Sequence, residues 1–211
     1  IQELLDLCEG VLEGVYPTRT EAVGEAPMIA WEGRSPAVCQ SKTARPRAVI
    51  PVFPGTNCEY DTANACLRAG IQPEIVVVRN LTPDALEQSA RDLEAAIRGA
   101  QMVVLPGGFS GGDEPDGSGK FIATTFRNPR IAQAVTDLLE ARDGLMLGIC
   151  NGFQALVKLG LVPYGEIRDM GPDCATLTFN DIGRHQSRYV TTRVASVNSP
   201  WMLKSAVGDL H

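Results

Sequence analysis

Short apolar runs alternate with helical stretches through the middle of the chain, and this alternation restricts the fold more than any other feature of the sequence. The apolar runs are rich in β-branched residues and bounded by Gly or Pro, as is typical of buried strands. They span 48–53, 74–78, 102–105 and 145–149. Residues at helical spacing fill 59–69, 83–98 and 129–141. This order predicts an α/β fold with a doubly wound, mostly parallel sheet, which binds ligands at the carboxyl ends of its strands.

A different pattern precedes the first of these strands. Apolar residues recur at helical spacing over 1–12 and predict an amphipathic helix that docks on another domain. From 16 to 47 the chain is rich in Pro, Gly, Ser, Thr and Ala, the composition of a connector. We therefore expect 1–46 to be a linker or docking segment that follows a preceding domain.

The helical period fades after Gly165. The stretches 175–179 and 189–196 instead predict antiparallel strands on one side of the sheet. We therefore expect the main domain to run from 47 to 211.

Composition and charge exclude several classes of protein. The 211 residues are 44% hydrophobic and 21% charged, which is ordinary for a globular protein. The net charge of −6 and the lack of a Lys/Arg cluster argue against nucleic acid and anionic membranes as partners. The sequence has neither a spanning apolar run nor a signal peptide, so we expect a cytoplasmic protein. Six cysteines without a Cys-x-x-Cys pair and two histidines predict no metal site.

One cysteine lies in a sequence pattern that is typical of a nucleophile. Cys150 follows a predicted strand, precedes a helical run and is flanked by Gly148 and Gly152. Small flanking residues permit a sharp strand-to-helix turn that exposes the nucleophile. The N-terminus of the helix favours thiolate over thiol, and a thiolate can attack an amide carbonyl. The alternative is a small buried cysteine in a tight turn; the coincidence of strand, turn and helix favours the nucleophile.

A second glycine-rich turn, 105–113, follows the third predicted strand. Its backbone N–H groups, with that of Asn151, could form an oxyanion hole beside Cys150. The turn fits neither G-x-G-x-x-G nor the P-loop, so nucleotide binding there is not expected. We interpret the acidic run that follows as a solvated loop rather than a cation site. That run comprises Asp113, Glu114 and Asp116.

Cys58 is a rival thiol, because it also follows a predicted strand. The stretch from Thr56 to Glu59 reads as a capping box, in which both side chains satisfy N–H groups at the start of a helix. We therefore interpret Cys58 as structural. We interpret the two histidines, His185 and His211, in the same way, because a lone histidine is more often a packing residue than a base.

These motifs together resemble the class I (triad-type) glutamine amidotransferases, and in particular the glutaminase domains of phosphoribosylformylglycinamidine synthases. The resemblance runs from about Arg47 to the end of the chain. The segments that carry it are 52–59, 105–113, 148–154, 160–165 and 199–201. The Gly-x-Cys-x-Gly-x-Gln element marks the wider family, whereas Pro-Gly-x-Asn-Cys and Gly-Gly-Phe-Ser point to this branch.

The resemblance implies a flavodoxin-like fold and a set of roles for individual residues. Cys150 would attack the side-chain amide of glutamine to form a thioester. Gly108 and Asn151 would supply the N–H groups of the oxyanion hole, and Gly107 and Gln154 would help to hold the substrate. No cofactor is expected in this domain.

The resemblance also implies a partner. Ammonia from glutamine would pass to a synthetase domain of the same polypeptide, which uses ATP and Mg²⁺ to amidate formylglycinamide ribonucleotide. The alternative is another cysteine hydrolase, or a chaperone-like member, of the same doubly wound superfamily. A third hypothesis is a docking module without activity of its own.

Two departures from the family pattern bear on activity. The family takes its base from a His-Gly-Glu stretch after the Ser-Pro-Trp region, and no such stretch precedes His211. We therefore expect the chain to be truncated before its catalytic dyad and to be nearly inactive alone. Asn180, Arg184 and Arg188 match a family segment near the glutamine site, but Ile182 and His185 replace its Ser and Phe.

Overall fold

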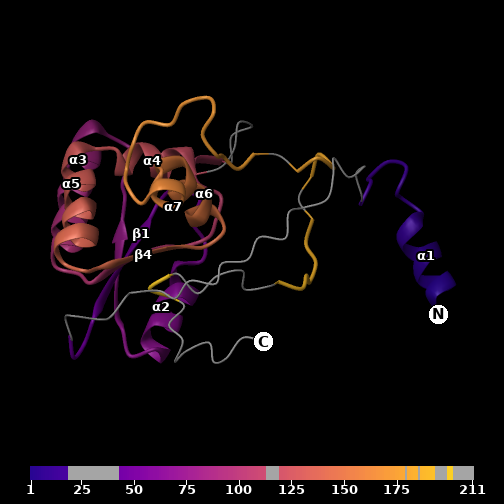
Figure 1. The fold of residues 1–211 in the computed structure, drawn as a ribbon, viewed down its shortest axis with the longest axis horizontal. Helices are drawn as coiled ribbons and strands as arrows, with labels where there is room; N and C mark the ends of the chain where they lie inside the picture. The colour runs from indigo at the N-terminus through magenta and orange to yellow at the C-terminus, as the bar shows by residue number, and fades with distance from the viewer. Residues whose placement is uncertain (19–42, 113–118, 179, 185, 193–198, 202–211) are drawn as a thin grey trace. The chain divides into compact units, whose positions relative to one another are not determined.

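The computed structural model describes residues 1–18, 43–112, 119–178, 180–184, 186–192 and 199–201 (Figure 1). The chain divides into two compact units. One comprises 1–38 and 179–211, and the other comprises 39–178. The interpretations of His185, of His211 and of the acidic run at 113–116 lie outside the described residues, as does most of the predicted connector.

The larger unit is built on a parallel sheet of four strands. They are β1 (Arg47–Val52), β2 (Gln72–Val77), β3 (Met102–Leu105) and β4 (Leu145–Gly148). Their order is β2-β1-β3-β4, and each neighbouring pair is parallel. All four predicted strands are confirmed to within two residues at either end. The chain reverses its direction of winding between β1 and β3, and in such sheets the crevice at that point is where ligands bind.

Helices cover both faces of this sheet, so the doubly wound prediction is confirmed. One face packs against α2 (Glu59–Arg68), with Ala48, Ile50, Met102 and Val104 from the strands. The other face contributes Val49, Val103 and Leu105 to the larger core. The helices that pack there are α3 (Pro83–Arg98), α4 (Lys120–Phe126), α5 (Pro129–Thr136) and α6 (Asn151–Leu159). The short helix α7 (Leu161–Tyr164) follows α6.

Local signals set the ends of α3. Thr82 accepts a hydrogen bond from the backbone N–H of Ala85 at 3.1 Å, and Pro83 occupies the first turn. At the other end, the guanidinium group of Arg142 donates to backbone carbonyls at 2.9 Å. These carbonyls belong to Ile97, Arg98 and Ala100. A cation therefore lies at the negative end of the α3 dipole.

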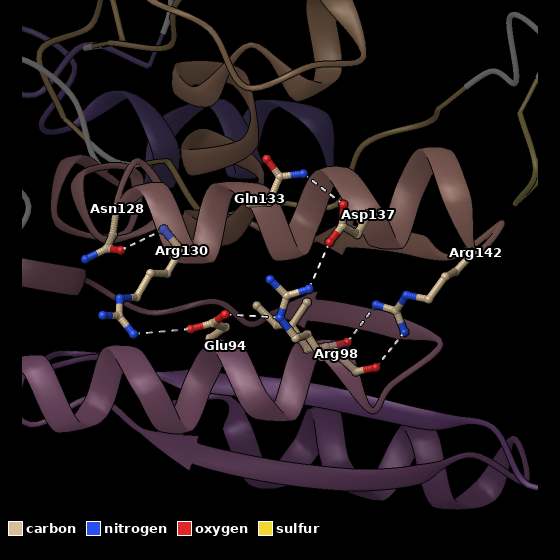
Figure 2. A network of polar contacts seen from close by, with 8 residues as sticks. Glu94, Arg98, Asn128, Arg130, Gln133, Asp137 and Arg142 are labelled. Atoms are coloured by element: carbon tan, nitrogen blue, oxygen red, sulfur yellow. Dashed lines mark hydrogen bonds and ion pairs between the residues drawn. The ribbon is translucent and has the colours of Figure 1, made fainter.

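A polar network joins α3 to α5 and to the π-helical turn η2 (Asp137–Ala141) (Figure 2). Arg98 donates to Glu94 at 3.0 Å and to Asp137 at 2.8 Å, and Gln133 donates to Asp137 at 2.8 Å. The N-cap of α5, Asn128, accepts from the N–H of Arg130 at 3.1 Å. Polar side chains thus connect α3 with α5 and η2 on the surface of the unit.

Three parts of the prediction differ from the structure. The predicted helix 129–141 changes from α5 to a π-helical turn at Asp137. Helix α4 was not predicted, because its seven residues are too few to show a clear period. The described residues of the two predicted antiparallel strands, 175–178 and 189–192, form no strand; the rest lie outside the described residues. Within the residues that the structure describes, the alternating pattern there has no neighbouring strand with which to pair.

The smaller unit contains α1 (Gln2–Gly10) and part of the C-terminal segment. The predicted N-terminal helix is confirmed, and its apolar side chains, such as Leu4 and Leu7, are exposed. Arg184 donates to the carbonyls of Tyr16 and Pro17 at 3.2 and 3.3 Å. No helix in the described part of the chain is both long and apolar enough to cross a membrane.

Candidate active site

Cys150 lies at a strained turn between β4 and α6. Its backbone has φ 51° and ψ −107°, an unfavourable region for a residue with a side chain. A Cβ atom at Gly148 would lie 2.6 Å from the carbonyl oxygen of Gly152. One at Gly152 would overlap the carbonyl oxygen of Leu105. The predicted sharp turn is therefore confirmed, and Cys150 is exposed there.

The glycine-rich turn after β3 passes beside this cysteine. A Cβ atom at Gly107 would lie 3.5 Å both from the Cβ atom of Cys150 and from the Sγ atom of Cys58. Gly108 has φ 147°, and a Cβ atom there would lie 2.7 Å from the carbonyl oxygen of Gly55. Gly108 thus requires glycine, because its φ is positive and backbone lies close to it, whereas a Cβ atom at Gly107 would make only ordinary van der Waals contacts.

The loop after β1 supports the glycine-rich turn from the other side. The N–H of Phe109 donates to the carbonyl of Gly55 at 2.9 Å, and that of Gly111 donates to the carbonyl of Pro54 at 2.9 Å. An isolated antiparallel bridge pairs Thr56 with Gly108. The segments after β1, β3 and β4 therefore meet at the carboxyl ends of the strands, as predicted for the ligand crevice.

The side chain of Asn151 links the turn at Cys150 to the glycine-rich turn. It is 1% exposed. Its Oδ1 atom accepts from the backbone N–H of Ser110 at 3.1 Å, and its Nδ2 atom donates to Oε1 of Gln154 at 3.1 Å. The structure thus brings together the predicted site residues of two segments, Gly107 and Gly108 after β3 and Cys150, Asn151 and Gln154 after β4.

Two backbone N–H groups at this place, both in buried residues, lack a hydrogen-bond acceptor in the described structure. Within the described part of the chain, the N–H groups of Gly108 and Asn151 donate to no acceptor. Asn151 is the first residue of α6, where N–H groups have no partner inside the helix. These are the two donors that the sequence predicts for an oxyanion hole.

Comparison with known proteins decides the family. Residues 45–211 match the CobB/CobQ-like glutamine amidotransferase domain. The chain belongs to this family. It resembles the phosphoribosylformylglycinamidine synthase subunit PurQ of Treponema denticola, with 36% identity over 176 residues, 79% of this chain and 60% of that protein. The same subunit of Dehalococcoides mccartyi is 38% identical over 143 residues, 68% of this chain and 50% of that protein.

The amidotransferase chain thus spans only 50–60% of the length of these two curated relatives. Among solved structures, it matches PurLQS from Thermotoga maritima at 33% identity with a TM-score of 0.38. That match covers 56% of this chain and 45% of the other.

The capping box predicted for the amidotransferase at Cys58 is wrong. The N-cap of α2 is Cys58 itself, and no side chain caps the helix. The Oγ1 atom of Thr56 accepts from the N–H of Phe53 at 3.1 Å, because the loop doubles back there. The Oε2 atom of Glu59 is buried and has no partner among the described residues. The thiol of Cys58 donates to Oδ1 of Asn57 at 3.1 Å.

Two cysteine thiols of the amidotransferase that lie away from this turn have shifted pKa values. Burial raises the pKa of the Cys66 thiol on α2, which makes it a poor nucleophile. A hydrogen bond with Tyr164 lowers the pKa of Cys174, and the same hydrogen bond raises the pKa of Tyr164. Neither thiol lies in the segments that meet at Cys150. The described residues contain no cluster of His, Cys, Asp or Glu that could hold a metal ion.

Sequence reasoning missed two parts of the site. The support from Pro54 and Gly55 was not foreseen, although the Pro-Gly-Thr-Asn run was part of the family resemblance. The link from Asn151 to Ser110 joins residues 41 positions apart, so no local pattern signals it. Asn180, Arg184 and Arg188 belong to the smaller unit.

Proposed function

We propose that Cys150 is the nucleophile of a glutaminase that supplies ammonia to a phosphoribosylformylglycinamidine synthase. The arrangement at Cys150 carries this proposal: an exposed thiol at a strained turn lies beside two N–H groups without acceptors. The names of the PurQ relatives support the pathway. Family membership supports glutamine as the substrate.

The chemistry follows from these groups. The Cys150 thiolate attacks the side-chain amide carbon of glutamine, and the carbonyl oxygen becomes an oxyanion. The N–H groups of Gly108 and Asn151 donate to that oxyanion. When the intermediate collapses, the C–N bond breaks, ammonia leaves with a proton and a thioester remains. Water then hydrolyses the thioester to glutamate and restores the thiol. Gly107 and Gln154 line the substrate side of the turn.

Proton transfer in this scheme requires a base. In the printed sequence His185 is followed by Gln186 and Ser187, so it does not begin a His-x-Glu stretch. We propose that the base comes from a His-x-Glu dyad outside these 211 residues. The described residues contribute the nucleophile and the donors to the oxyanion.

The rest of the enzyme follows the same proposal. The ammonia is consumed by a synthetase domain or subunit that binds ATP and Mg²⁺, and this chain needs no cofactor of its own. We propose that 1–46 joins that synthetase to the glutaminase domain at 47–211, and that the enzyme is cytoplasmic.

Labelling with a diazoketone analogue of glutamine tests the proposal. We expect covalent label on Cys150, protection by glutamine, and loss of label in Cys150→Ser. The matched control is Cys58→Ser, which removes the neighbouring thiol and should retain label. Peptide mapping by mass spectrometry identifies the modified residue. Label on Cys58 with Cys150 untouched would refute the proposal, whereas turnover of unrelated peptides or aldehydes without turnover of glutamine would favour another cysteine hydrolase.

A further inference from the structure

The side chain of Asn151 has no place in the mechanism above, which uses only its backbone N–H. Yet this side chain is 1% exposed and makes two hydrogen bonds of 3.1 Å, to Ser110 and to Gln154. Its orientation is determined by Ser110: a backbone N–H can only donate, so it must face the amide oxygen of Asn151, and the NH₂ group then faces Gln154.

Three successive N–H groups anchor the glycine-rich turn in alternating directions. Those of Phe109 and Gly111 donate to the loop after β1, at the carbonyls of Gly55 and Pro54. The one between them, from Ser110, donates to Oδ1 of Asn151. At the start of the glycine-rich turn, the carbonyl of Leu105 accepts from the N–H of Ile149 at 3.0 Å. Beyond Leu105, the hydrogen bond from Ser110 is the one bond among the described residues that ties this turn to the turn at Cys150. The attachment of the glycine-rich turn beyond Leu105 therefore depends on a single side-chain oxygen.

The two proposed oxyanion donors lie on opposite sides of this hydrogen bond. Gly108 belongs to the glycine-rich turn and Asn151 belongs to the turn at Cys150. The separation of their N–H groups therefore depends on how closely the two turns are held together. An oxyanion hole is effective only when both donors lie within hydrogen-bond distance of the same oxygen.

We propose that the Asn151 side chain is a positioning residue of the glutaminase, an inference that rests on the proposed function. Through Oδ1 it holds Gly108 opposite its own backbone N–H, and through Nδ2 it fixes the amide of Gln154 on the substrate side. One side chain thereby couples the oxyanion hole to substrate binding. Both a donor and an acceptor are needed, which explains an amide at this position.

The substitution Asn151→Leu tests this role, because leucine has a similar size and can make neither hydrogen bond. The protein is the product of the complete gene, assayed with its synthetase partner. Two rates are measured: glutamate release from glutamine, and alkylation of Cys150 by iodoacetamide. Both start from the same thiolate, but alkylation is a direct displacement and forms no oxyanion. We expect kcat for glutamine to fall about tenfold to a hundredfold while the alkylation rate changes less than about threefold.

The matched control is Ser89→Ala. Ser89 is 1% exposed and hydrogen-bonded, like Asn151, but it lies on α3 and contacts Arg79 and Ala85. It reports what the loss of a buried hydrogen bond does by lowering stability alone. We expect Ser89→Ala to retain wild-type turnover. An equal fall in both variants would overturn the proposal, as would wild-type turnover in Asn151→Leu or a parallel fall in turnover and alkylation.

A second variant keeps the test decisive if Asn151→Leu does not fold. Asn151→Asp still accepts from Ser110 but cannot donate to Gln154. If the leucine variant folds, the aspartate variant should have the higher ratio of turnover to alkylation. Its KM should rise, because the amide of Gln154 must flip to donate to the carboxylate and so presents the other group to the substrate. A ratio of turnover to alkylation and a KM that both equal those of the wild type would overturn the proposal. If the wild-type protein neither hydrolyses glutamine nor is labelled at Cys150, the proposed function itself fails.

Discussion

Gly152 has no space for a side chain, because the carbonyl oxygen of Leu105 occupies the place where a Cβ atom would lie. The contact is with backbone of β3, which a neighbouring rotamer change cannot relieve. The glycine therefore sets how closely α6 can approach the sheet, and with it the place of Cys150.

We expect Gly152→Ala to lower the free energy of unfolding by about 2–3 kcal/mol, because α6 must move away from β3. Glutamine turnover should fall with it, since the turn at Cys150 moves with the helix. Urea denaturation provides the measurement. Gly171→Ala is the control, because a Cβ atom there meets nothing within 4 Å. Equal stability of the two variants would contradict the expectation.

Individual residues were predictable where their signal is local. The Gly-x-Cys-x-Gly pattern predicts the strained turn because Gly148 meets the carbonyl of Gly152, which the turn itself brings near. The contact of Gly152 with Leu105 is not local, because it depends on the folded sheet. The capping box failed because its pattern fits a helix start at Thr56, whereas the loop doubles back and α2 begins at Glu59. The hydrogen bond from Ser110 to Asn151 depends on two strands that pair only in the folded sheet, so the local sequence could not show it.

At the scale of elements, the contact between α3 and the turn η2 depends on the charge of Asp137. Hydrogen bonds from Gln133, and then from Arg98, hold the pKa of Asp137 below its usual value (Figure 2). A carboxyl group with a lower pKa in the folded state stabilises the fold above the pKa of the unfolded state. This contribution is lost as pH falls through the folded pKa.

We therefore expect the difference in Tm between the wild type and Asp137→Asn to be full at neutral pH and to begin to fall as pH drops to about 4, the usual pKa of an aspartate. It should vanish only below the lowered pKa of the folded state. The group is exposed, so the difference is small. Thermal unfolding followed by circular dichroism across this range measures it. Gln133→Ala, which removes the first of the two donors, should show part of the same pH dependence. A difference that grows toward acid would have the wrong sign.

Elements in the middle of the chain were predictable because each shows its own period and ends at Gly, Pro or a capping residue. The four strands and α3 are examples. The prediction of strands at 175–179 and 189–196 failed for their described residues, because an alternating pattern forms a strand only when a partner edge is available, and sequence does not reveal that edge. Helix α4 was not predicted, because its seven residues are too few to show a helical period.

For the molecule as a whole, the proposed mechanism requires different groups for covalent labelling of Cys150 and for turnover of glutamine. These 211 residues contain the proposed nucleophile and both proposed oxyanion donors but no His-x-Glu stretch. Under the proposal that the base comes from outside these residues, we expect them alone to release ammonia from glutamine at least about a hundredfold more slowly than a protein that also carries the dyad. The assay couples ammonia release to glutamate dehydrogenase. Equal rates would contradict the proposal that the base lies outside these residues.

The order of the strands has a consequence for synthesis. Strand β1 lies between β2 and β3, and β4 pairs with β3, so the sheet is incomplete until Gly148 has left the ribosome. Parallel pairing across such separations is slow, since long loops must close first. Cys150 follows β4 directly, so a nascent chain that stalls before β4 lacks both the last strand of the described sheet and the proposed nucleophile.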